Sequence, residues 1–470
     1  MVKLDHDRGP RIAILNVVGL CKRHLGEHTP KLTSFAKSEG NKEYLIRPVM
    51  PAVTCSVQST YLTGKLPTEH GIVGNGWYDR ELNEHQFWKQ SNKLVQCEKL
   101  WDSVKKKRPN LKSANLFWWY NMYSNVDFSI TPRPLYRSDG LKAFDIHSHP
   151  LSIRCEIKQE LGNFPFPAFW GPKAGISSSQ WIADAARWVE KKYHPDLNLI
   201  YLPHLEYDFQ RYGPSDPRSL KALAEIDQIA GSLIDFFSTQ GVECLVLSEY
   251  GITEVSKVIY PNRIFRHQGW LNLKEEFGLE TLDSGGSQAF ALTDHQIAHI
   301  YLPQSNPALR RKVRSCLESM DGVATVFEGK EREMCGLNHQ RAGDLVALAE
   351  EDAWFAYYFW EDDELAPEFA RCIDIHRKHG YDPVELFVNP EITFPTLIAA
   401  RKLLAKKLGF RIHMDFIPLD PSLVKGSHGA KPKSSLDWPV LLGKTSICGN
   451  SIESTTVHEI LMDRLLTGET

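Results

Sequence analysis

The sequence predicts an α/β fold in which a doubly wound, mostly parallel sheet carries helices on both faces. Short apolar runs of strand length alternate along the chain with longer segments of helical period. Small polar clusters follow the ends of several of these apolar runs. Ligands of such folds bind beyond the carboxyl ends of the strands, so the polar clusters mark the expected site.

The individual elements follow this alternation in order. Residues 11–18 (RIAILNVV) form an apolar run that ends at a glycine, as expected of a buried parallel strand. A helix is expected from Thr29, because Pro30 suits a first turn and Gly40 can end the helix. The later expected helices span residues 94–107, 176–192 and 216–240, and the expected strands span residues 113–120, 198–202 and 241–248.

Residues 123–179 break the alternation, because Pro, aromatic and polar residues mix there without a sustained period. We expect an excursion off the sheet that caps the site, as an aromatic-rich insertion within one catalytic domain spanning residues 1–470. Aromatic residues at 117–119 and 169–170 could stack on a base or sugar, although such runs more often belong to a core.

Composition narrows the class of protein. The chain has 470 residues, of which 42% are hydrophobic, and a formal net charge of −3. A near-neutral charge argues against a nucleic-acid polymer or a membrane surface as the partner. The nine cysteines form no C-x-x-C pair and the N-terminus lacks the pattern of an export signal, so we expect reduced thiols in a cytoplasmic protein. A homo-oligomer is compatible with the sequence.

The rest of the chain is organised around residues 48–79. A Pro-flanked, extended lead-in reaches Thr54, and no Pro or Gly follows until Gly64, so a helix can begin at Thr54. Backbone N–H groups at a helix start are unpaired and attract anions. A hydroxyl placed there is a candidate nucleophile toward phosphorus. Thr is also a common N-cap, and the local sequence alone favours that capping role.

The motifs of this segment favour one of these two roles for Thr54. Their order along the chain is Pro51, Thr54, Thr63-Gly64, Pro67, His70-Gly71-Ile72 and Asn75. This order resembles the nucleophile segment of the alkaline phosphatase superfamily, most closely its nucleotide pyrophosphatase/phosphodiesterase branch. The resemblance implies that Thr54 attacks phosphorus and that Asn75 holds a substrate phosphate oxygen. A sulfatase is disfavoured, because Cys55 is not followed by the x-P-S-R of that branch.

Phosphoryl transfer of this kind uses two divalent metal ions, one at the attacking oxygen and one at the leaving oxygen. His204 and Asp208 follow the strand at 198–202 and precede a Gly-Pro pair, in exchanged order relative to the family's P-D-x-x-x-H. His428 matches the histidine of the family's G-x-H-G. The resemblance implies that these three residues hold the first ion. Two imidazoles and one carboxylate suit zinc, with manganese as the alternative.

The second ion has fewer expected ligands. Glu249 and Tyr250 stand where the family has S-D-H-G, so Glu249 can replace the Asp, whereas Tyr250 is expected to bond a substrate oxygen. The family's first strand ends in Asp-Gly, but this chain reads Val18-Gly19. Asn16 lies two residues earlier on the same side of the strand and could offer its amide oxygen. We therefore expect a weaker second site made of Asn16, Thr54 and Glu249.

Further candidate ligands lie in residues 372–387 (CIDIHRKHGYDPVELF). Asp374 and His376 alternate in a strand-like run, so we expect at least one of them to line the same pocket as Thr54. Lys378 follows and is assigned to substrate binding. A similar polar run at residues 294–299 (DHQIAH) favours a structural role.

These observations support one leading function and two alternatives. The leading hypothesis is a metal-dependent hydrolase that cleaves a phosphodiester, pyrophosphate or phosphate monoester bond of a phosphorylated small molecule through a phospho-threonine. Thr54 and Asn75 favour a diester or a pyrophosphate. The missing first-strand Asp motivates the alternative of a non-catalytic descendant that binds a phosphorylated small molecule. A third hypothesis is that the chain is a relative of the phosphomutases.

Overall fold

The computed structural model describes residues 9–138, 142–303, 306–445 and 447–467, and its centre is a nine-stranded sheet. In spatial order the strands are β23 (Ser451–Glu453), β2 (Asn41–Arg47), β22 (Val440–Lys444), β11 (Glu243–Leu247), β1 (Ile12–Val17), β10 (Leu197–Leu202), β5 (Ser113–Leu116), β6 (Phe128–Pro132) and β9 (Ile146–His149). The strands from β11 to β6 run parallel, whereas β22 is antiparallel to both neighbours and β9 is antiparallel to β6.

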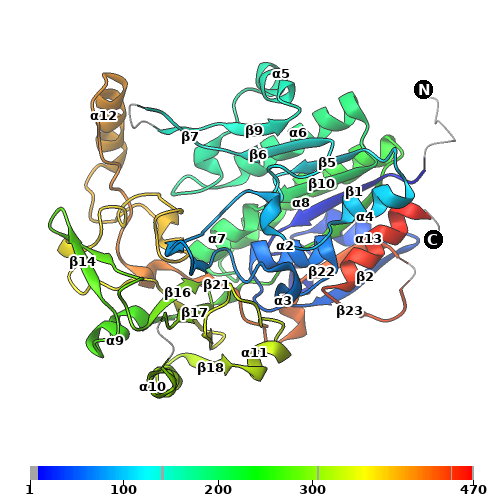
Figure 1. Ribbon diagram of the computed structural model, residues 1–470. Helices are drawn as coiled ribbons and strands as arrows, with labels where there is room; N and C mark the ends of the chain where they lie inside the picture. Colours follow the sequence, from blue (N-terminus) through cyan, green and yellow to red (C-terminus); the bar gives the residue numbers. More distant parts are fainter. Residues whose placement is uncertain (1–8, 139–141, 304–305, 446, 468–470) are drawn as a thin grey trace.

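Helices cover both faces of this sheet (Figure 1). One set packs around α8 and comprises α1 (Pro30–Ala36), α6 (Ile176–Tyr193), α7 (His204–Tyr212) and α8 (Pro217–Thr239), with α5 (Ser152–Leu161) against α6. The other set comprises α2 (Thr54–Thr63), α3 (Pro67–His70), α4 (Leu100–Lys107) and α13 (Thr456–Leu466). The predicted α/β architecture, with its mostly parallel sheet, is therefore confirmed.

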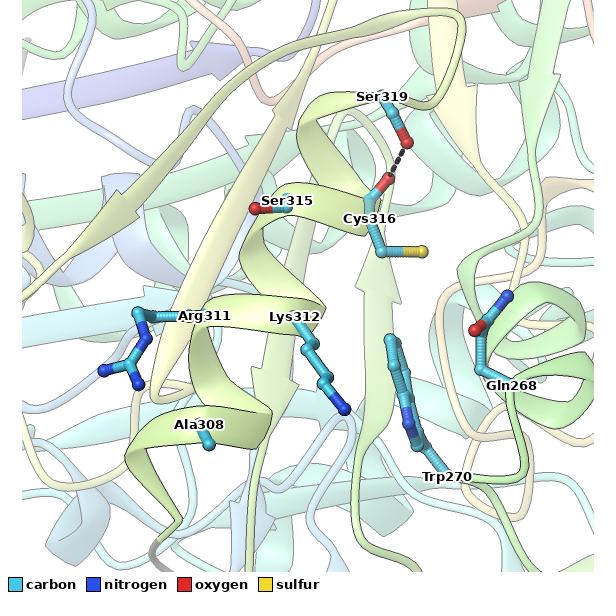
Figure 2. Close-up of a pocket in the computed structure, with 8 residues that line it drawn as sticks. All are labelled: Gln268, Trp270, Ala308, Arg311, Lys312, Ser315, Cys316 and Ser319. Atoms are coloured by element: carbon cyan, nitrogen blue, oxygen red, sulfur yellow. Dashed lines mark hydrogen bonds between the residues drawn. The ribbon is translucent and has the colours of Figure 1, made fainter.

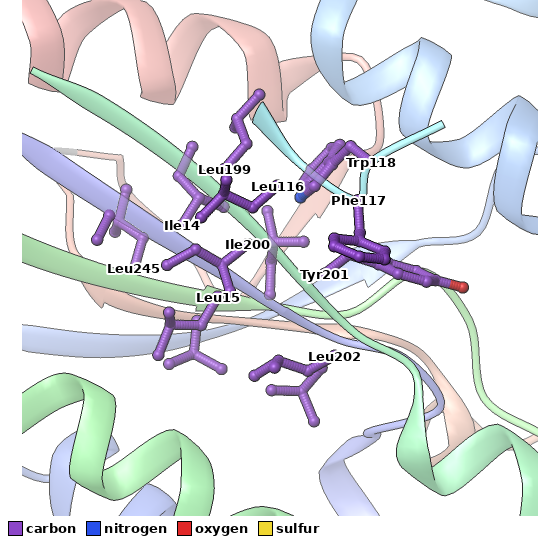
Figure 3. Close-up of a cluster of buried hydrophobic side chains, with 14 of the residues drawn as sticks. Ile14, Leu15, Leu116, Phe117, Trp118, Leu199, Ile200, Tyr201, Leu202 and Leu245 are labelled. Carbon is purple, nitrogen blue, oxygen red and sulfur yellow. The ribbon is translucent and has the colours of Figure 1, made fainter. Parts of the chain in front are cut away.

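The central strands are buried along their whole length, as parallel strands covered on both faces must be. All six residues of β1 are buried, and so are all six of β10. Figure 3 shows Leu15, Ile200 and Leu245 from three neighbouring strands packed in this core. Burial of each such side chain contributes about 1.5–3 kcal/mol. This rigid core fixes the strand ends from which the polar clusters project.

The segment 123–179 differs from the expected excursion off the sheet. Its strands β6 and β9 extend one edge of the central sheet, while β7 (Leu135–Tyr136) and β8 (Lys142–Ala143) pair outside it. Residues 139–141 of the segment lie outside the described part of the chain. The strands are short and carry prolines at or near their ends, which edge strands tolerate. Such strands show no sustained period, and this is why the sequence pattern concealed them.

The larger departure from the central sheet lies between residues 253 and 430, which supply most of a second hydrophobic core. Its sheet has four antiparallel strands in the order β16 (Phe290–Asp294), β17 (Ile297–Tyr301), β19 (Leu345–Ala349) and β18 (Val323–Glu328). The helices of this region are α9 (Pro261–His267), α10 (Pro307–Glu318), α11 (Lys330–Met334) and α12 (Pro395–Lys407). Its paired short strands are β12 (Thr253–Glu254) with β21 (Gly426–Ser427), β13 (Lys257–Ile259) with β20 (Ala353–Phe355), and β14 (Leu273–Glu276) with β15 (Leu279–Leu282).

A short hairpin of β3 (Tyr78–Asp79) and β4 (Glu84–His85) follows the segment that begins with α2.

Across the described ranges, no helix is both long enough and apolar enough to cross a membrane.

The start of α1 depends on a side chain from another helix. Asp227, buried on α8, accepts hydrogen bonds from the backbone N–H groups of Lys31 (3.0 Å) and Leu32 (2.8 Å). We predict that Asp227→Ala lowers the free energy of unfolding by about 1–3 kcal/mol, because it leaves these helix-start donors without an acceptor. Urea denaturation measures the loss. Asp235→Ala, at an exposed position of the same helix, should change the free energy of unfolding by no more than about 0.5 kcal/mol. Equal losses would contradict this assignment.

Candidate active site

Thr54 lies at the first residue of α2, after Val53 in an extended conformation. Its side chain is buried, with 2% of the residue surface exposed. The Thr54 Oγ1 and Tyr250 OH atoms are 2.8 Å apart, within hydrogen-bond distance. Burial raises the pKa of Tyr250 well above its usual value, so the phenol keeps its proton and can donate a hydrogen bond to Thr54. The structure therefore places a hydroxyl at a helix N-terminus, with a phenolic donor beside it.

Asn75 is held close to this helix start. Its Oδ1 accepts a hydrogen bond from the backbone N–H of Cys55 at 3.0 Å. Asp294, at the end of β16, accepts from both the Asn75 backbone N–H (2.7 Å) and the Asn75 Nδ2 (3.0 Å). Burial raises the pKa of the Asp294 carboxyl to about 7, against the opposing effect of these hydrogen bonds. Both ends of the Asn75 amide are thus engaged by protein groups.

Glu249 is the centre of a second hydrogen-bonded group, just beyond the end of β11. Its Oε1 accepts from Asn16 Nδ2 at 2.6 Å and from Gln58 Nε2 at 2.6 Å. Burial raises the pKa of Glu249 to about 8, although both hydrogen bonds oppose the shift. Asn16 lies near the carboxyl end of β1, where it pairs in register with Leu247 of β11. The sheet therefore brings Asn16, Glu249 and Thr54 together as the sequence predicts.

The two predicted metal ligands on α7, His204 and Asp208, do not face the candidate site. His204 Nε2 lies 3.0 Å from Glu225 Oε2 on α8, and Asp208 Oδ1 accepts from Arg211 at 3.0 Å. Side chains two residues apart on a helix point about 200° apart around the helix axis. The inward pair is accordingly Glu206 and Gln210, joined by a 3.0 Å hydrogen bond from Gln210 Nε2 to Glu206 Oε1. Of the two inward residues, Glu206 is the one whose carboxylate belongs to the group that could hold a metal ion.

Three side chains from separate segments form a cluster that could hold a metal ion. Glu206 comes from α7, His295 from the turn between β16 and β17, and His428 from the residue after β21. One potential ligand atom of each lies within 4.8 Å of the others. His428 Nδ1 donates to the Ala52 carbonyl at 2.8 Å, while its Nε2 is buried without a hydrogen-bond partner. Unpaired buried donors and acceptors are costly, so this geometry fits a cation at the cluster.

A column of stacked rings connects this cluster to Thr54. Tyr250 stacks on His428 with ring centroids 3.6 Å apart, and His428 lies 3.7 Å from His295. His295 in turn stacks on Tyr381 at 3.7 Å. Burial lowers the pKa of His295 well below its usual value, so its imidazole is neutral, as a metal ligand must be. The Tyr250 hydroxyl and ring therefore link the nucleophile to the histidine cluster.

His295 and its neighbours are the functional residues that sequence reasoning missed. The turn at residues 295–296 joins two buried strands, and His295 has a φ of +61°. Such left-handed conformations of residues other than Gly are uncommon and gather at functional sites. The available signal was the polar Asp-His-Gln run between two apolar strands, which we assigned to a structural role. Glu206, Gln58 and Asp294 were missed for a similar reason, since none stands in a recognisable motif.

Asp374 and His376 lie elsewhere, contrary to prediction. Asp374 is an ion-pair partner of Arg377, at 4.0 Å, and His376 Nδ1 lies 3.1 Å from the Phe87 carbonyl oxygen. In the part of the chain that the structure describes, neither forms a hydrogen bond or ion pair with Thr54 or Glu249. Residues 372–378 form turns instead of a strand, so alternate side chains do not share one side. The expectation that one of them reaches the Thr54 site is therefore wrong.

Lys378 is fully buried and paired inside the protein. Its Nζ lies 2.7 Å from Asp382 Oδ2 and 2.8 Å from Glu385 Oε1. Removing a buried charge from its partner costs about 3–5 kcal/mol, so recruiting Lys378 to a substrate would be costly. The Glu385 carboxylate also accepts from Trp170 Nε1 at 2.6 Å. The contacts of Lys378 are those of a residue that holds this region together.

Aromatic residues pack around Tyr381, at the end of the ring column that lies away from Thr54. Trp119 and Trp88 have ring centroids 4.8 Å apart, and Trp170 lies 5.5 Å from Tyr381. Phe117, by contrast, packs on Phe164 in the main core. Of the aromatic residues expected near the site, Trp170 therefore contacts the ring column directly and Trp119 contacts it through Trp88.

A shallow surface hollow of about 750 Å³ lies elsewhere, beside α10 (Figure 2). Figure 2 shows Lys312 and Trp270 projecting into the same space from opposite sides. The hollow is lined by none of the residues that the sequence singles out. It is therefore not the candidate active site.

Comparison with known proteins agrees with the geometry. The model of the family "Type I phosphodiesterase / nucleotide pyrophosphatase" matches residues 13–382. An uncharacterized pyrophosphatase/phosphodiesterase of Schizosaccharomyces pombe is 27% identical over 251 residues, covering 50% of this chain and 44% of the relative. Human ectonucleotide pyrophosphatase/phosphodiesterase family member 1 is 27% identical over 229 residues, covering 46% of this chain and 21% of the relative. The chain thus matches less than half the length of each.

Solved structures share the fold across almost the whole chain. Murine ectonucleotide pyrophosphatase/phosphodiesterase 5, solved as an inactive variant with AMP, has a TM-score of 0.56 at 14% identity and covers 97% of this chain and 95% of its own. Phosphonoacetate hydrolase from Sinorhizobium meliloti, solved with phosphonoformate, has a TM-score of 0.62 at 14% identity, with 97% and 96% covered. The alkaline-phosphatase-like fold inferred from the motifs is confirmed. This chain belongs to the type I phosphodiesterase / nucleotide pyrophosphatase family.

Proposed function

We propose that the chain hydrolyses a phosphodiester or pyrophosphate bond of a phosphorylated small molecule, with Thr54 as the nucleophile. The observation that carries the proposal is the position of Thr54 at the N-terminus of α2, hydrogen-bonded to Tyr250. The unpaired N–H groups and the dipole of a helix start favour the charge that develops on an attacked phosphoryl group. Family membership supports the same reaction class.

The reaction has two steps at Thr54. In the first, Thr54 Oγ1 forms a bond to phosphorus while the bond from phosphorus to the leaving oxygen breaks, and the hydroxyl proton passes by way of water to that leaving oxygen. In the second, water attacks the phospho-threonine, which releases phosphate or a phosphomonoester and restores the hydroxyl. The Tyr250 phenol donates a hydrogen bond to the Thr54 oxygen and so stabilises negative charge on it. Asn75 and Cys55 fix the start of the helix beneath the reacting oxygen.

The cluster of Glu206, His295 and His428 would hold the metal ion that the family requires. When bound, such an ion supplies Lewis acidity toward a phosphate oxygen. Two neutral imidazoles and one carboxylate suit zinc best, with manganese as the alternative. Glu206 is positioned by Gln210, which in turn accepts a hydrogen bond from Tyr381 at 2.9 Å. Second-layer hydrogen bonds of this kind hold ligand side chains in place.

Aromatic side chains support a substrate that carries a base or another flat group. Trp88 and Trp170 lie next to Tyr381, whose ring belongs to the column that contains His295, and Trp119 packs on Trp88. Stacking on such rings stabilises a base with little dependence on its identity. The AMP and phosphonoformate bound to the two similar structures are likewise small phosphorus-containing anions. We therefore propose a nucleotide-like phosphodiester or pyrophosphate as the substrate class.

One observation favours a second candidate, a non-catalytic protein that binds a phosphorylated small molecule. Thr54 is 2% exposed, and both ends of the Asn75 amide are occupied by Cys55 and Asp294. A substrate phosphate must displace these contacts before Thr54 can attack. Turnover assays on the intact chain separate the two candidates.

We predict that Thr54→Ala lowers kcat by about 10⁴-fold or more on any substrate that the wild type turns over, because the attacking oxygen is lost. Thr54→Ser should retain measurable activity. The assay is release of p-nitrophenol from mono- and diesters, together with hydrolysis of nucleotide pyrophosphates. Thr60→Ala is the matched control, because Thr60 lies on the same helix and bonds only within the protein. A Thr54→Ala variant with near-normal kcat would refute the mechanism.

We predict that Tyr250→Phe lowers kcat by about 10²-fold and leaves KM nearly unchanged, because the phenol acts on charge that develops at Thr54. The Phe ring can still stack on His428, so the ion-binding cluster should be preserved. Tyr357→Phe is the control, since this hydroxyl is buried without a partner in the second core. An unchanged kcat for Tyr250→Phe would exclude a role for the hydroxyl.

A further inference from the structure

We infer that α12 and the residues at its two ends bind an anionic lipid surface, with exposed leucines among the lipids and cations on the headgroups. None of the residues assigned to the candidate active site lies on this helix. Figure 1 shows α12 at the upper left, standing away from the central sheet. The inference therefore concerns an interaction surface and does not depend on the proposed function.

α12 has no partner for its apolar side chains. Pro395 starts the helix, and Gly409, with a φ of +94°, follows its end. A helix of this length is normally stabilised by burying one apolar face against the rest of the protein. None of its residues is buried. In the part of the chain that the structure describes, nothing therefore covers the apolar face of α12.

Three leucines form a stripe along one side of the helix. Leu397, Leu404 and Leu408 follow at helical spacing, and 69%, 60% and 70% of their surfaces are exposed. Lys402 is instead turned toward the returning chain, where its Nζ pairs with Asp415. Side chains two residues apart point about 200° apart around the helix axis. Leu404 is thus directed away from the protein body.

Phenylalanines flank the leucine stripe at both ends. Phe394 immediately precedes α12, Phe410 follows Gly409, and both rings are exposed. Phe394 has a φ of +57°, a left-handed conformation that is uncommon for a bulky residue and that gathers at functional positions. Exposed apolar side chains are ordinary when they are scattered singly, whereas a continuous row of them marks an interaction surface.

The local charge identifies the kind of partner. Residues 394–411 contain five Lys or Arg side chains and no Asp or Glu, although the whole chain has a net charge of −3. The near-neutral total, on which the expectation of no membrane partner rests, conceals this basic segment. Arg401 and Lys407 are exposed on opposite sides of the leucine stripe. A second copy of the same segment would repel these cations, whereas an anionic surface complements them.

The residue types favour a lipid surface over an acidic protein. Protein interfaces are depleted in Lys, and their strongest contacts come from Trp, Tyr and Arg. Leu and Phe beside Lys and Arg are typical of helices that lie in the plane of a membrane interface. Anionic headgroups attract such cations, while the acyl boundary accepts the apolar side chains. α12 would therefore lie along the lipid surface.

The experiment is flotation of the whole chain with lipid vesicles. We expect binding to vesicles that mix phosphatidylcholine with phosphatidylserine, and an affinity at least about tenfold weaker for phosphatidylcholine alone. Binding should weaken as salt is added, because ions screen the attraction. Hydrogen exchange of the wild type should slow at residues 394–411 when the mixed vesicles are present. This second measurement needs no variant.

Two double variants test the two halves of the inference. Leu404→Ser with Leu408→Ser should lower the affinity for the mixed vesicles by at least about tenfold, because the inserted side chains are lost. Arg401→Gln with Lys407→Gln should lower it by at least about tenfold and reduce its salt dependence. All four side chains are exposed, so Tm should change little.

The controls change exposed side chains on helices that lie far from α12 in Figure 1. Met334→Ser on α11 is the apolar control, and Arg311→Gln with Lys312→Gln on α10 is the charge control. Both should keep the wild-type affinity. Equal affinity for the two kinds of vesicle, equal losses in variants and controls, or no vesicle binding would overturn the inference. Self-association of the chain, lost in the leucine variant and without vesicle binding, would assign this surface to a second copy instead.

Discussion

The contact of the β16–β17 turn with Asn75 and with His428 is the constraint on which the candidate site depends. Asp294 holds Asn75, and the next residue, His295, enters the ring column beside His428. Gln296 completes the attachment, because its backbone N–H donates to the His428 carbonyl at 2.9 Å. Buried polar groups must find partners, so these reciprocal contacts define one position for the turn. Three consecutive residues thus join the nucleophile segment, the histidine cluster and the second core.

The buried carboxyl groups of the site explain much of its electrostatics. Glu206, Glu249 and Asp294 are all buried, with 6%, 1% and 1% of their surface exposed. The charge of Glu206 adds to the effect of burial in raising the pKa values of Glu249 and Asp294. Neutral amides, from Asn16 and Gln58 at Glu249 and from Asn75 at Asp294, supply hydrogen bonds that partly offset the cost of burial. Buried acid of this kind favours a cation, and Glu206, His295 and His428 are the residues whose ligand atoms converge closely enough to hold one.

The departures from the family pattern are related to one another. The family resemblance implies that Tyr250 stands where a histidine ligand is expected, and that Asn16 stands near the place of the first-strand aspartate. In the structure, the Tyr250 hydroxyl lies within hydrogen-bond distance of Thr54, and the Asn16 amide donates to Glu249. His295 adds an imidazole from a different element to the cluster at Glu206.

The sequence by itself determined the sheet, the position of Thr54 and the grouping of Asn16 with Glu249. These features depend on local rules: apolar runs predict strands, a Pro- and Gly-free run predicts α2, and residues that follow parallel strands meet at one edge. It also identified His428 from its motif. Only the tertiary structure decided which face of α7 turns inward, because the helical period fits His204 with Asp208 as well as Glu206 with Gln210. The placement of His295, and the exclusion of Asp374 and His376, likewise depended on how the second sheet packs against the first, which no local pattern encodes.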